Sequence, residues 1–346
     1  MAKGDRVRIN LALQGGGAHG AFTWGVLDRL LEESRIEIAG ISGTSAGALN
    51  GAALKAGLVA GGRDAARENL DWLWGEVGKI ADLRFPRWVF AGVPEALREV
   101  WTGIAAFPAL DTFSRVFSPY DYPMVADNPL RGIAERFRYE RICGDAGPAL
   151  FVAATNVRTG KIRVFTGNEI SADALLASVC LPTFFRAVEM RDPATGRREA
   201  FWDGGYSGNP ALFPLYTPDL PRDVVIVNIN PIVRKDLPRS ALEIQSRINE
   251  VSFNASLMGE LRAINFVHEL LAEGKIPEGA MKNVFVHMIA DDDLMNSLSV
   301  VTKTFALPSL LDDLKAAGRQ AADRFLSRHG DRIGVEGTVD LPTLYG

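Results

Sequence analysis

Residues 7–20 of the chain are VRINLALQGGGAHG, and this stretch decides the class of fold. Apolar side chains alternate along residues 7–13 with the period of a β-strand, and three glycines follow at once. Apolar residues then recur at helical spacing over 22–31, and residues 36–41 form a second strand-like run. An Ala- and Leu-rich segment at 45–56 suits another helix. This order predicts an α/β fold built on a parallel sheet.

The rest of the chain continues this alternation of strands and helices. Several strand candidates are apolar at nearly every position, as expected of strands that are covered on both faces. Further strands are expected at 149–154, 161–165, 199–203, 224–229 and 283–289, and helices at 129–139, 171–180, 240–272 with breaks, and 309–328. No linker composition forces a domain boundary, so residues 1–346 are expected to form one domain.

Residues 72–124 differ in character because aromatic side chains crowd there between scattered prolines. We interpret this segment as an irregular, partly helical insertion. It can be a helical cap packed on the sheet, or a flap whose aromatic residues line an acyl pocket or touch a lipid surface.

The bulk composition excludes several classes of protein. The 346 residues are 47% hydrophobic and carry a formal net charge of -4, so no overall basic field is present to hold nucleic acid. The two cysteines, Cys143 and Cys180, match neither a metal knuckle nor a redox pair. No signal peptide or membrane span is recognisable. We therefore expect a cytoplasmic protein, at most peripheral at a membrane, without metal or cofactor.

Two glycine-containing turns between a strand and a helix carry the first chemical signals. Residues 15–20, GGGAHG, expose backbone amides beside a helix N-terminus, where a phosphate or an oxyanion is stabilised. Residues 43–47, GTSAG, have the pattern of a nucleophile elbow, in which a tight turn projects Ser45 above the sheet.

The third signal is an acidic residue, Asp203, in the sequence FWDGG at 201–205. It lies at the end of a predicted strand, on the edge of the sheet where α/β active sites gather. Each motif is weak alone, since an Asp-Gly turn is common and a glycine-rich turn also binds dinucleotides. Together the three turns indicate acyl transfer at one edge of a parallel sheet.

These motifs resemble the patatin-like phospholipase family. The glycine-rich turn at 15–20, the G-x-S-x-G at 43–47 and the D-G-G at 203–205 stand in the order of that family. Residues 177–182, ASVCLP, are similar to its A-S-x-x-x-P block. The resemblance covers about residues 7–232 and fades over the helical C-terminal part, 233–346.

The resemblance implies a three-layer α/β/α sandwich that hydrolyses acyl esters of lipids with a serine-aspartate dyad and no catalytic histidine. Ser45 would attack the ester carbonyl, and Asp203 would accept its proton. The expected oxyanion donors are the amides of the turn formed by Gly15, Gly16, Gly17 and Ala18, and the expected motif glycines are Gly20, Gly43, Gly47, Gly204 and Gly205. The chain departs from the family at His19, where many members carry Arg or Lys, and at Gln14, to which we attach no function.

A free aspartate has a pKa of about 3.9 and is a poor base towards a hydroxyl group. Burial against Phe201 and Trp202 is expected to raise the pKa of Asp203, because burial penalises the charged form.

Three alternatives stay open from the sequence. A conventional Ser-His-Asp triad would need His287, the histidine in a predicted strand near the C-terminus. A dinucleotide-binding protein would need an acidic residue at the end of the second strand, which is absent there. A non-catalytic acyl-binding or regulatory protein would keep the fold without turnover. Acyl-chain length, headgroup, regiospecificity and oligomeric state are not encoded in any recognisable pattern.

Overall fold

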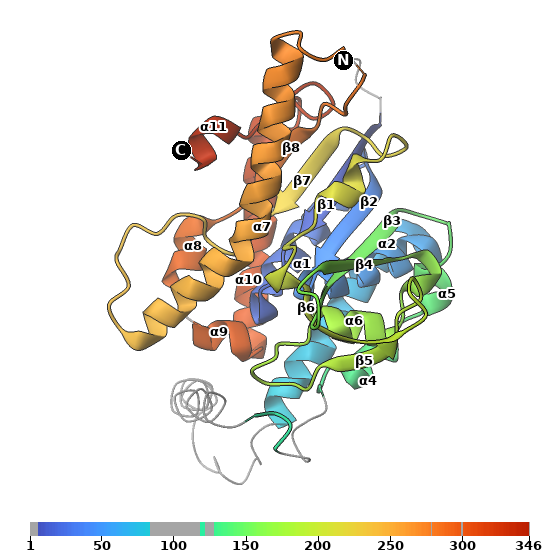
Figure 1. Cartoon of the computed structure of the whole chain (residues 1–346), viewed down its shortest axis with the longest axis vertical. Coiled ribbons are helices and arrows are strands. Elements are labelled where there is room, and N and C mark those ends of the chain that lie inside the picture. Colours follow the sequence, from blue (N-terminus) through green and yellow to red (C-terminus); the bar gives the residue numbers. More distant parts are fainter. Residues whose placement is uncertain (1–5, 84–117, 122–127, 278, 299, 346) are drawn as a thin grey trace.

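One mixed sheet forms the centre of the computed structural model, which describes residues 6–83, 118–121, 128–277, 279–298 and 300–345 (Figure 1). Its eight strands have the order β5-β6-β3-β2-β1-β7-β8, with β4 also paired to β3. The strands are β1 Val7–Leu13, β2 Ile36–Thr44, β3 Ala149–Asn156, β4 Ile162–Thr166, β5 Val188–Arg191, β6 Arg198–Asp203, β7 Asp223–Val227 and β8 Phe285–Ile289. Strands β3, β2, β1, β7 and β8 run parallel, whereas β4, β5 and β6 pair in antiparallel fashion.

Helices cover both faces of this sheet. Alternate side chains of β1 and β7 point to opposite faces: Leu11 and Val225 pack with α1, α2 and α10, whereas Ala12 and Val224 pack with α7. The helices are α1 Gly20–Leu30, α2 Ala46–Leu83, α4 Arg131–Ala134, α5 Tyr139–Ile142, α6 Ala172–Ser178, α7 Ala241–Ala272, α8 Asp292–Ser297, α9 Val300–Thr304, α10 Pro308–His329 and α11 Leu341–Tyr345. The expected three-layer α/β/α architecture with a mostly parallel sheet is confirmed.

Local signals in the sequence explain where the C-terminal helices begin. Ser240 and Glu243 form a capping box at the start of α7, and Pro308 opens α10, where its missing amide hydrogen needs no acceptor. Helix α7 runs without interruption to Ala272 and lies alongside β7 and β8 (Figure 1). The helix expected over 240–272 is therefore confirmed, and the breaks that the sequence left open within it are absent.

Two expected boundaries are wrong. Residues 72–83 belong to α2, which bends at Gly61 and Gly62, and not to the aromatic insertion. Trp74 of this helix is 3% exposed and stacks on Trp24. The remaining insertion, residues 84–117 and 122–127, lies outside the described residues. The single helix expected at 129–139 is instead the two short helices α4 and α5.

Strands β2 and β6 meet end to end beside β3. Thr44, the last residue of β2, pairs with Ala153, and Asp203, the last residue of β6, pairs with Ala154. Because β4 occupies the other edge of β3 at both positions, β2 and β6 share one edge. Asp203 lies at the carboxyl end of β6, as expected, but this strand is antiparallel to β3, so the three turns do not all follow parallel strands.

Within the described ranges, no helix is both long enough and apolar enough to cross a membrane.

Candidate active site

Ser45 occupies a sharp turn between β2 and α2. Its φ of 54° lies in the left-handed region, and no other non-glycine residue in the described part of the chain has a positive φ. Such a conformation costs about 1–3 kcal/mol unless its surroundings enforce it. The Ser45 amide donates to Ser178 Oγ over 2.8 Å. The turn requires glycine at position 47, because a Cβ there would lie 2.1 Å from the Leu13 carbonyl oxygen. This is the geometry of a nucleophile elbow.

Asp203 is completely buried at the end of β6. Its backbone is fixed by a bond from its amide to the Cys180 carbonyl and by a bond from Thr155 Oγ1 to its own carbonyl, both 2.8 Å long. Its Oδ1 accepts the Gly205 amide at 2.7 Å, whereas Oδ2 has no hydrogen-bond partner among the described residues. A buried carboxylate oxygen without a donor is rare in folded proteins and calls for a functional explanation.

Burial raises the pKa of Asp203 to about 7, although the Gly205 amide and the Ser45 side chain act in the opposite direction. The direction of this shift is the one expected from the sequence. A carboxylate with a pKa near neutrality accepts a proton far more readily than an ordinary aspartate does. The structure thus places the side chain of Ser45 close enough to Asp203 to influence the pKa of its carboxyl group.

The glycine-rich turn at the end of β1 lies directly against Ser45. A Cβ on Gly15 would be 2.5 Å from the Cβ of Ser45. The Gly15 amide donates to Asn209 Oδ1 over 2.6 Å, which removes Gly15 from the expected set of oxyanion donors. The backbone hydrogen bonds between described residues give no acceptor to the amides of Gly16, Gly17 and Ala18. These three amides are the donors that the turn leaves available.

The remaining motif glycines also surround this point. Gly20 approaches Ala46, and Gly43 approaches the Gly47 carbonyl. Gly204 and Gly205 form the short turn after Asp203. The three turns singled out in the sequence therefore converge around Ser45.

Three residues that sequence reasoning missed hold the glycine-rich turn in place. Gln14 is fully buried, and its Oε1 accepts the backbone amides of Ile229 and Asn230 at 2.9 and 3.0 Å. Asn230 Nδ2 donates to the Gly15 carbonyl over 2.8 Å, and Asn209 Nδ2 donates to the same oxygen over 3.3 Å. Both asparagines lie about 200 residues along the chain, 194 and 215 positions from Gly15, so no local pattern marks them.

His287 does not reach the site. It is fully buried, with Nε2 at 3.0 Å from Asp223 Oδ1 and Nδ1 at 3.1 Å from Thr338 Oγ1. Asp223 begins β7, whereas Ser45 follows the carboxyl end of β2. Both ring nitrogens are therefore engaged near the amino ends of the strands, and the structure contradicts a triad through His287.

His19 supplies no positive charge to the turn. It is fully buried, and its Nε2 lies 2.8 Å from Thr302 Oγ1. Burial, with a smaller effect from the nearby Lys303, lowers the pKa of His19 well below its ordinary value. The imidazole is consequently neutral at physiological pH.

A cavity of about 1120 Å³ opens elsewhere, at the amino ends of β7 and β8. Arg222, His268 and Phe285 are among its lining residues, and none of the motif residues line it. Its position is therefore unrelated to the turns around Ser45.

Comparison with known proteins identifies the family. The model of the patatin-like phospholipase family matches residues 11–216. The fold is similar to that of VipD from Legionella pneumophila, with a TM-score of 0.42 and 14% identity over 93% of this chain and 67% of VipD. It is also similar to the ExoU-SpcU complex of the type III secretion system of Pseudomonas aeruginosa, with a TM-score of 0.33 and 16% identity over 96% of this chain. The match spans about half, 53%, of that second protein.

No curated protein matches the chain significantly. The family match, however, covers more than half of the 346 residues and contains all three motif turns. The chain therefore belongs to the patatin-like phospholipase family of lipid hydrolases.

Proposed function

We propose that the chain cleaves carboxylic ester bonds of phospholipids or related acyl esters through an acyl-enzyme on Ser45, with Asp203 as the base. One observation carries this proposal. The buried Oδ2 of Asp203 has no donor among the described residues, and the carboxyl group interacts with a serine held in a left-handed turn.

In the acylation step, Ser45 Oγ attacks the ester carbonyl carbon while its proton passes to Asp203. The carbonyl oxygen becomes an oxyanion, and the amides of Gly16, Gly17 and Ala18 supply donors for it. Removing one such donor typically raises the barrier by roughly 3 kcal/mol. Collapse of the intermediate breaks the bond to the leaving alkoxide, which takes the proton back from Asp203.

In the deacylation step, Asp203 accepts a proton from water as the water attacks the acyl-Ser45 carbonyl. The same amides hold the second oxyanion, and the proton returns to Ser45 as the fatty acid leaves. Each step uses Asp203 first as base and then as acid, which suits a group with a pKa of about 7.

A lipid substrate implies contact with a lipid surface, and we include peripheral association of a cytoplasmic protein with membranes in the proposal. Co-sedimentation with phosphatidylcholine vesicles tests this part separately. Binding without hydrolysis would favour the alternative, a non-catalytic acyl-binding protein.

The decisive experiment measures hydrolysis of p-nitrophenyl esters of increasing chain length and of phospholipid vesicles, together with labelling by a fluorophosphonate. Ser45→Ala is expected to abolish labelling and to lower turnover at least about ten-thousandfold, as for other serine nucleophiles. Ser327→Ala, at an exposed hydroxyl on α10, is the matched control and should change neither. Labelling that persists in Ser45→Ala would overturn the assignment of the nucleophile.

A further inference from the structure

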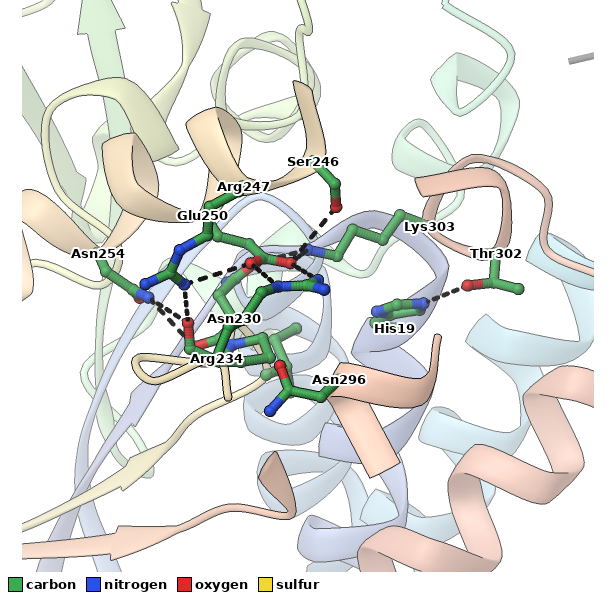
Figure 2. A network of polar contacts seen from close by, with 12 residues as sticks. His19, Asn230, Arg234, Ser246, Arg247, Glu250, Asn254, Asn296, Thr302 and Lys303 are labelled. Carbon is green, nitrogen blue, oxygen red and sulfur yellow. Dashed lines mark hydrogen bonds and ion pairs between the residues drawn. The ribbon is translucent and has the colours of Figure 1, made fainter. Parts of the chain in front are cut away.

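A buried charged cluster lies behind the glycine-rich turn, between α7 and α9 (Figure 2). Its centre is Glu250, whose side chain is 1% exposed. Arg234 Nη2 lies 2.6 Å from one carboxylate oxygen of Glu250, Arg247 Nη1 lies 3.5 Å from the other, and Lys303 Nζ lies 3.7 Å from the first. Burial alone raises the pKa of Glu250, but the bond from Arg234 and the charge of Lys303 outweigh burial and hold it below its ordinary value.

Lys303 connects this cluster to the turn in two ways. Its Nζ donates to Asn230 Oδ1 over 3.2 Å, and Asn230 Nδ2 donates to the Gly15 carbonyl over 2.8 Å. Its backbone carbonyl packs closely against the same turn, since a Cβ on Gly17 would lie 2.2 Å from the Lys303 carbonyl oxygen. The main chain of α9 therefore lies against the turn that carries the available amides, and the Lys303 side chain is connected to that turn through Asn230.

The chemistry of the groups fixes the orientation of the Asn230 amide. A lysine ammonium can only donate hydrogen bonds, so Asn230 must present its oxygen to Lys303. The Gly15 carbonyl and Gln14 Oε1 can only accept, so both must face the Asn230 nitrogen, at 2.8 and 3.1 Å. The contacts agree, and the amide has one orientation.

Stability alone is a weak explanation for this arrangement. Three cations share one carboxylate, and the Lys303 side chain is only 20% exposed. Buried ion pairs are often no more stabilising than apolar side chains of the same volume. The hydrogen bond from the ammonium to Asn230 and the approach of the Lys303 carbonyl to Gly17 connect this residue to the site.

We propose that Lys303 is a positioning residue for ester hydrolysis, which holds Asn230 and, through it, the turn that presents the Gly16, Gly17 and Ala18 amides to the oxyanion. This inference rests on the proposed function. Lys303 acts through Asn230 and does not touch the reacting atoms.

The test compares Lys303→Met, which keeps the length of the side chain but removes its donor and charge, with Lys315→Met. Lys315 also pairs with one carboxylate, that of Asp71, but on α10. Two quantities are measured: kcat and KM for a short p-nitrophenyl ester, and hydrogen exchange of the backbone amides in a peptide covering residues 14–22.

Lys303→Met is expected to lower kcat about tenfold or more with little change in KM, because a small displacement of the oxyanion donors is costly. Amide exchange over residues 14–22 should accelerate in the same variant. Lys303→Arg, which keeps a donor and a charge, should restore both quantities towards wild type, and Lys315→Met should leave them unchanged.

Asn230→Asp provides an independent variant should Lys303→Met fail to fold. It removes the shorter of two hydrogen bonds to the Gly15 carbonyl, at 2.8 Å against 3.3 Å from Asn209, and should produce the same faster exchange and lower kcat. Unchanged exchange and kcat in a folded Lys303→Met protein would overturn the proposal. A wild-type protein without turnover or labelling would refute the proposed function, whereas the exchange measurement would still decide the role of Lys303.

Discussion

Two buried aspartates lie at opposite ends of the same sheet and differ in how completely their carboxylate groups are hydrogen-bonded. Asp223 lies at the amino end of β7. Its Oδ1 accepts the Gly334 amide at 2.7 Å and lies 3.0 Å from His287 Nε2. Asp203, next to the carboxyl end of β2, accepts one backbone amide and leaves Oδ2 without a donor among the described residues.

The difference separates a structural carboxylate from a candidate catalytic one. Asp223 and His287 are paired as the acid and the base of a catalytic triad are paired. However, their other hydrogen-bond partners, Gly334 and Thr338, lie away from Ser45. The carboxylate with fewer partners is the one beside a strained serine. The carboxylate oxygen without a hydrogen-bond donor, and not the presence of an imidazole, therefore indicates the candidate site.

The largest expected effect comes from Asp203→Asn. The amide oxygen can still accept from Gly205, but the side chain can no longer take a proton from Ser45. Turnover of a p-nitrophenyl ester should fall by about ten-thousandfold, comparable to the loss of an acid residue in other serine hydrolases. A variant that keeps a tenth of wild-type kcat would contradict the role of Asp203 as base.

The same substitution should also stabilise the folded protein, and this effect should depend on pH. Burial raises the pKa of Asp203 from 3.8 to about 7, so the folded protein resists ionisation of this group. The resulting loss of stability is absent below pH 4, grows between pH 4 and 7, and is complete above pH 7. Asp203→Asn should therefore melt at a higher temperature than wild type at pH 8 and at about the same temperature at pH 4. Thermal unfolding at the two pH values checks this.

Gly17→Ala should have the next largest effect on activity. The residue has a φ of 61°, and a Cβ there would lie 2.2 Å from the Lys303 carbonyl oxygen, so the turn must move. We expect a loss of about a hundredfold in kcat from misplaced oxyanion donors. Gly160→Ala is the matched control, since Gly160 has a φ of 67° and nothing within 4 Å of the added Cβ. Equal kcat in the two variants would argue against the assignment of the donors.

The three turns that meet at the candidate site could be predicted because their signals are local. A strand, a tight turn and a helix are encoded within a few neighbouring residues, as at Gly43 to Gly47, and burial of Asp203 follows from its apolar neighbours. The supporting residues could not be predicted in this way. Gln14, Asn209, Asn230 and Lys303 act through contacts between segments that lie far apart in the sequence.

The topology was predicted only in part for a similar reason. Apolar runs identify β3 and β6, but they do not show that β6 pairs antiparallel with β3 beyond the end of β2. The aromatic content of residues 72–83 suggested an insertion. Trp74 is instead an interior residue of α2, where it packs against Gly20 and Trp24.

Ser178→Ala should have a smaller effect on activity. It removes the acceptor of the Ser45 amide, and a buried amide left without a partner costs about 1–3 kcal/mol. We expect kcat to fall about tenfold as the turn relaxes. Ser171→Ala removes the N-cap of the same helix, α6, and should lower stability by about 1 kcal/mol without affecting kcat. Similar kinetics for the two variants would show that Ser178 acts only on stability.

The smallest effect on activity is expected at the other end of the sheet. Asp223→Asn disturbs the bonds to His287 and Gly334 and should lower the free energy of unfolding by about 1–3 kcal/mol. The kcat of the folded fraction should remain at the wild-type value. A large fall in kcat without a change in stability would restore the triad as an alternative.

The rate at which a fluorophosphonate phosphonylates Ser45 with loss of fluoride, measured against pH in wild type and in Asp203→Asn, tests the central claim most directly. In wild type the rate should rise with pH and level off, with a midpoint near 7, because burial raises the pKa of Asp203 to about 7 and only the carboxylate can accept the proton. In Asp203→Asn the rate should be very low and independent of pH over the same range. A midpoint near 4, or a rate in Asp203→Asn close to that of wild type, would contradict the pairing of Ser45 with Asp203.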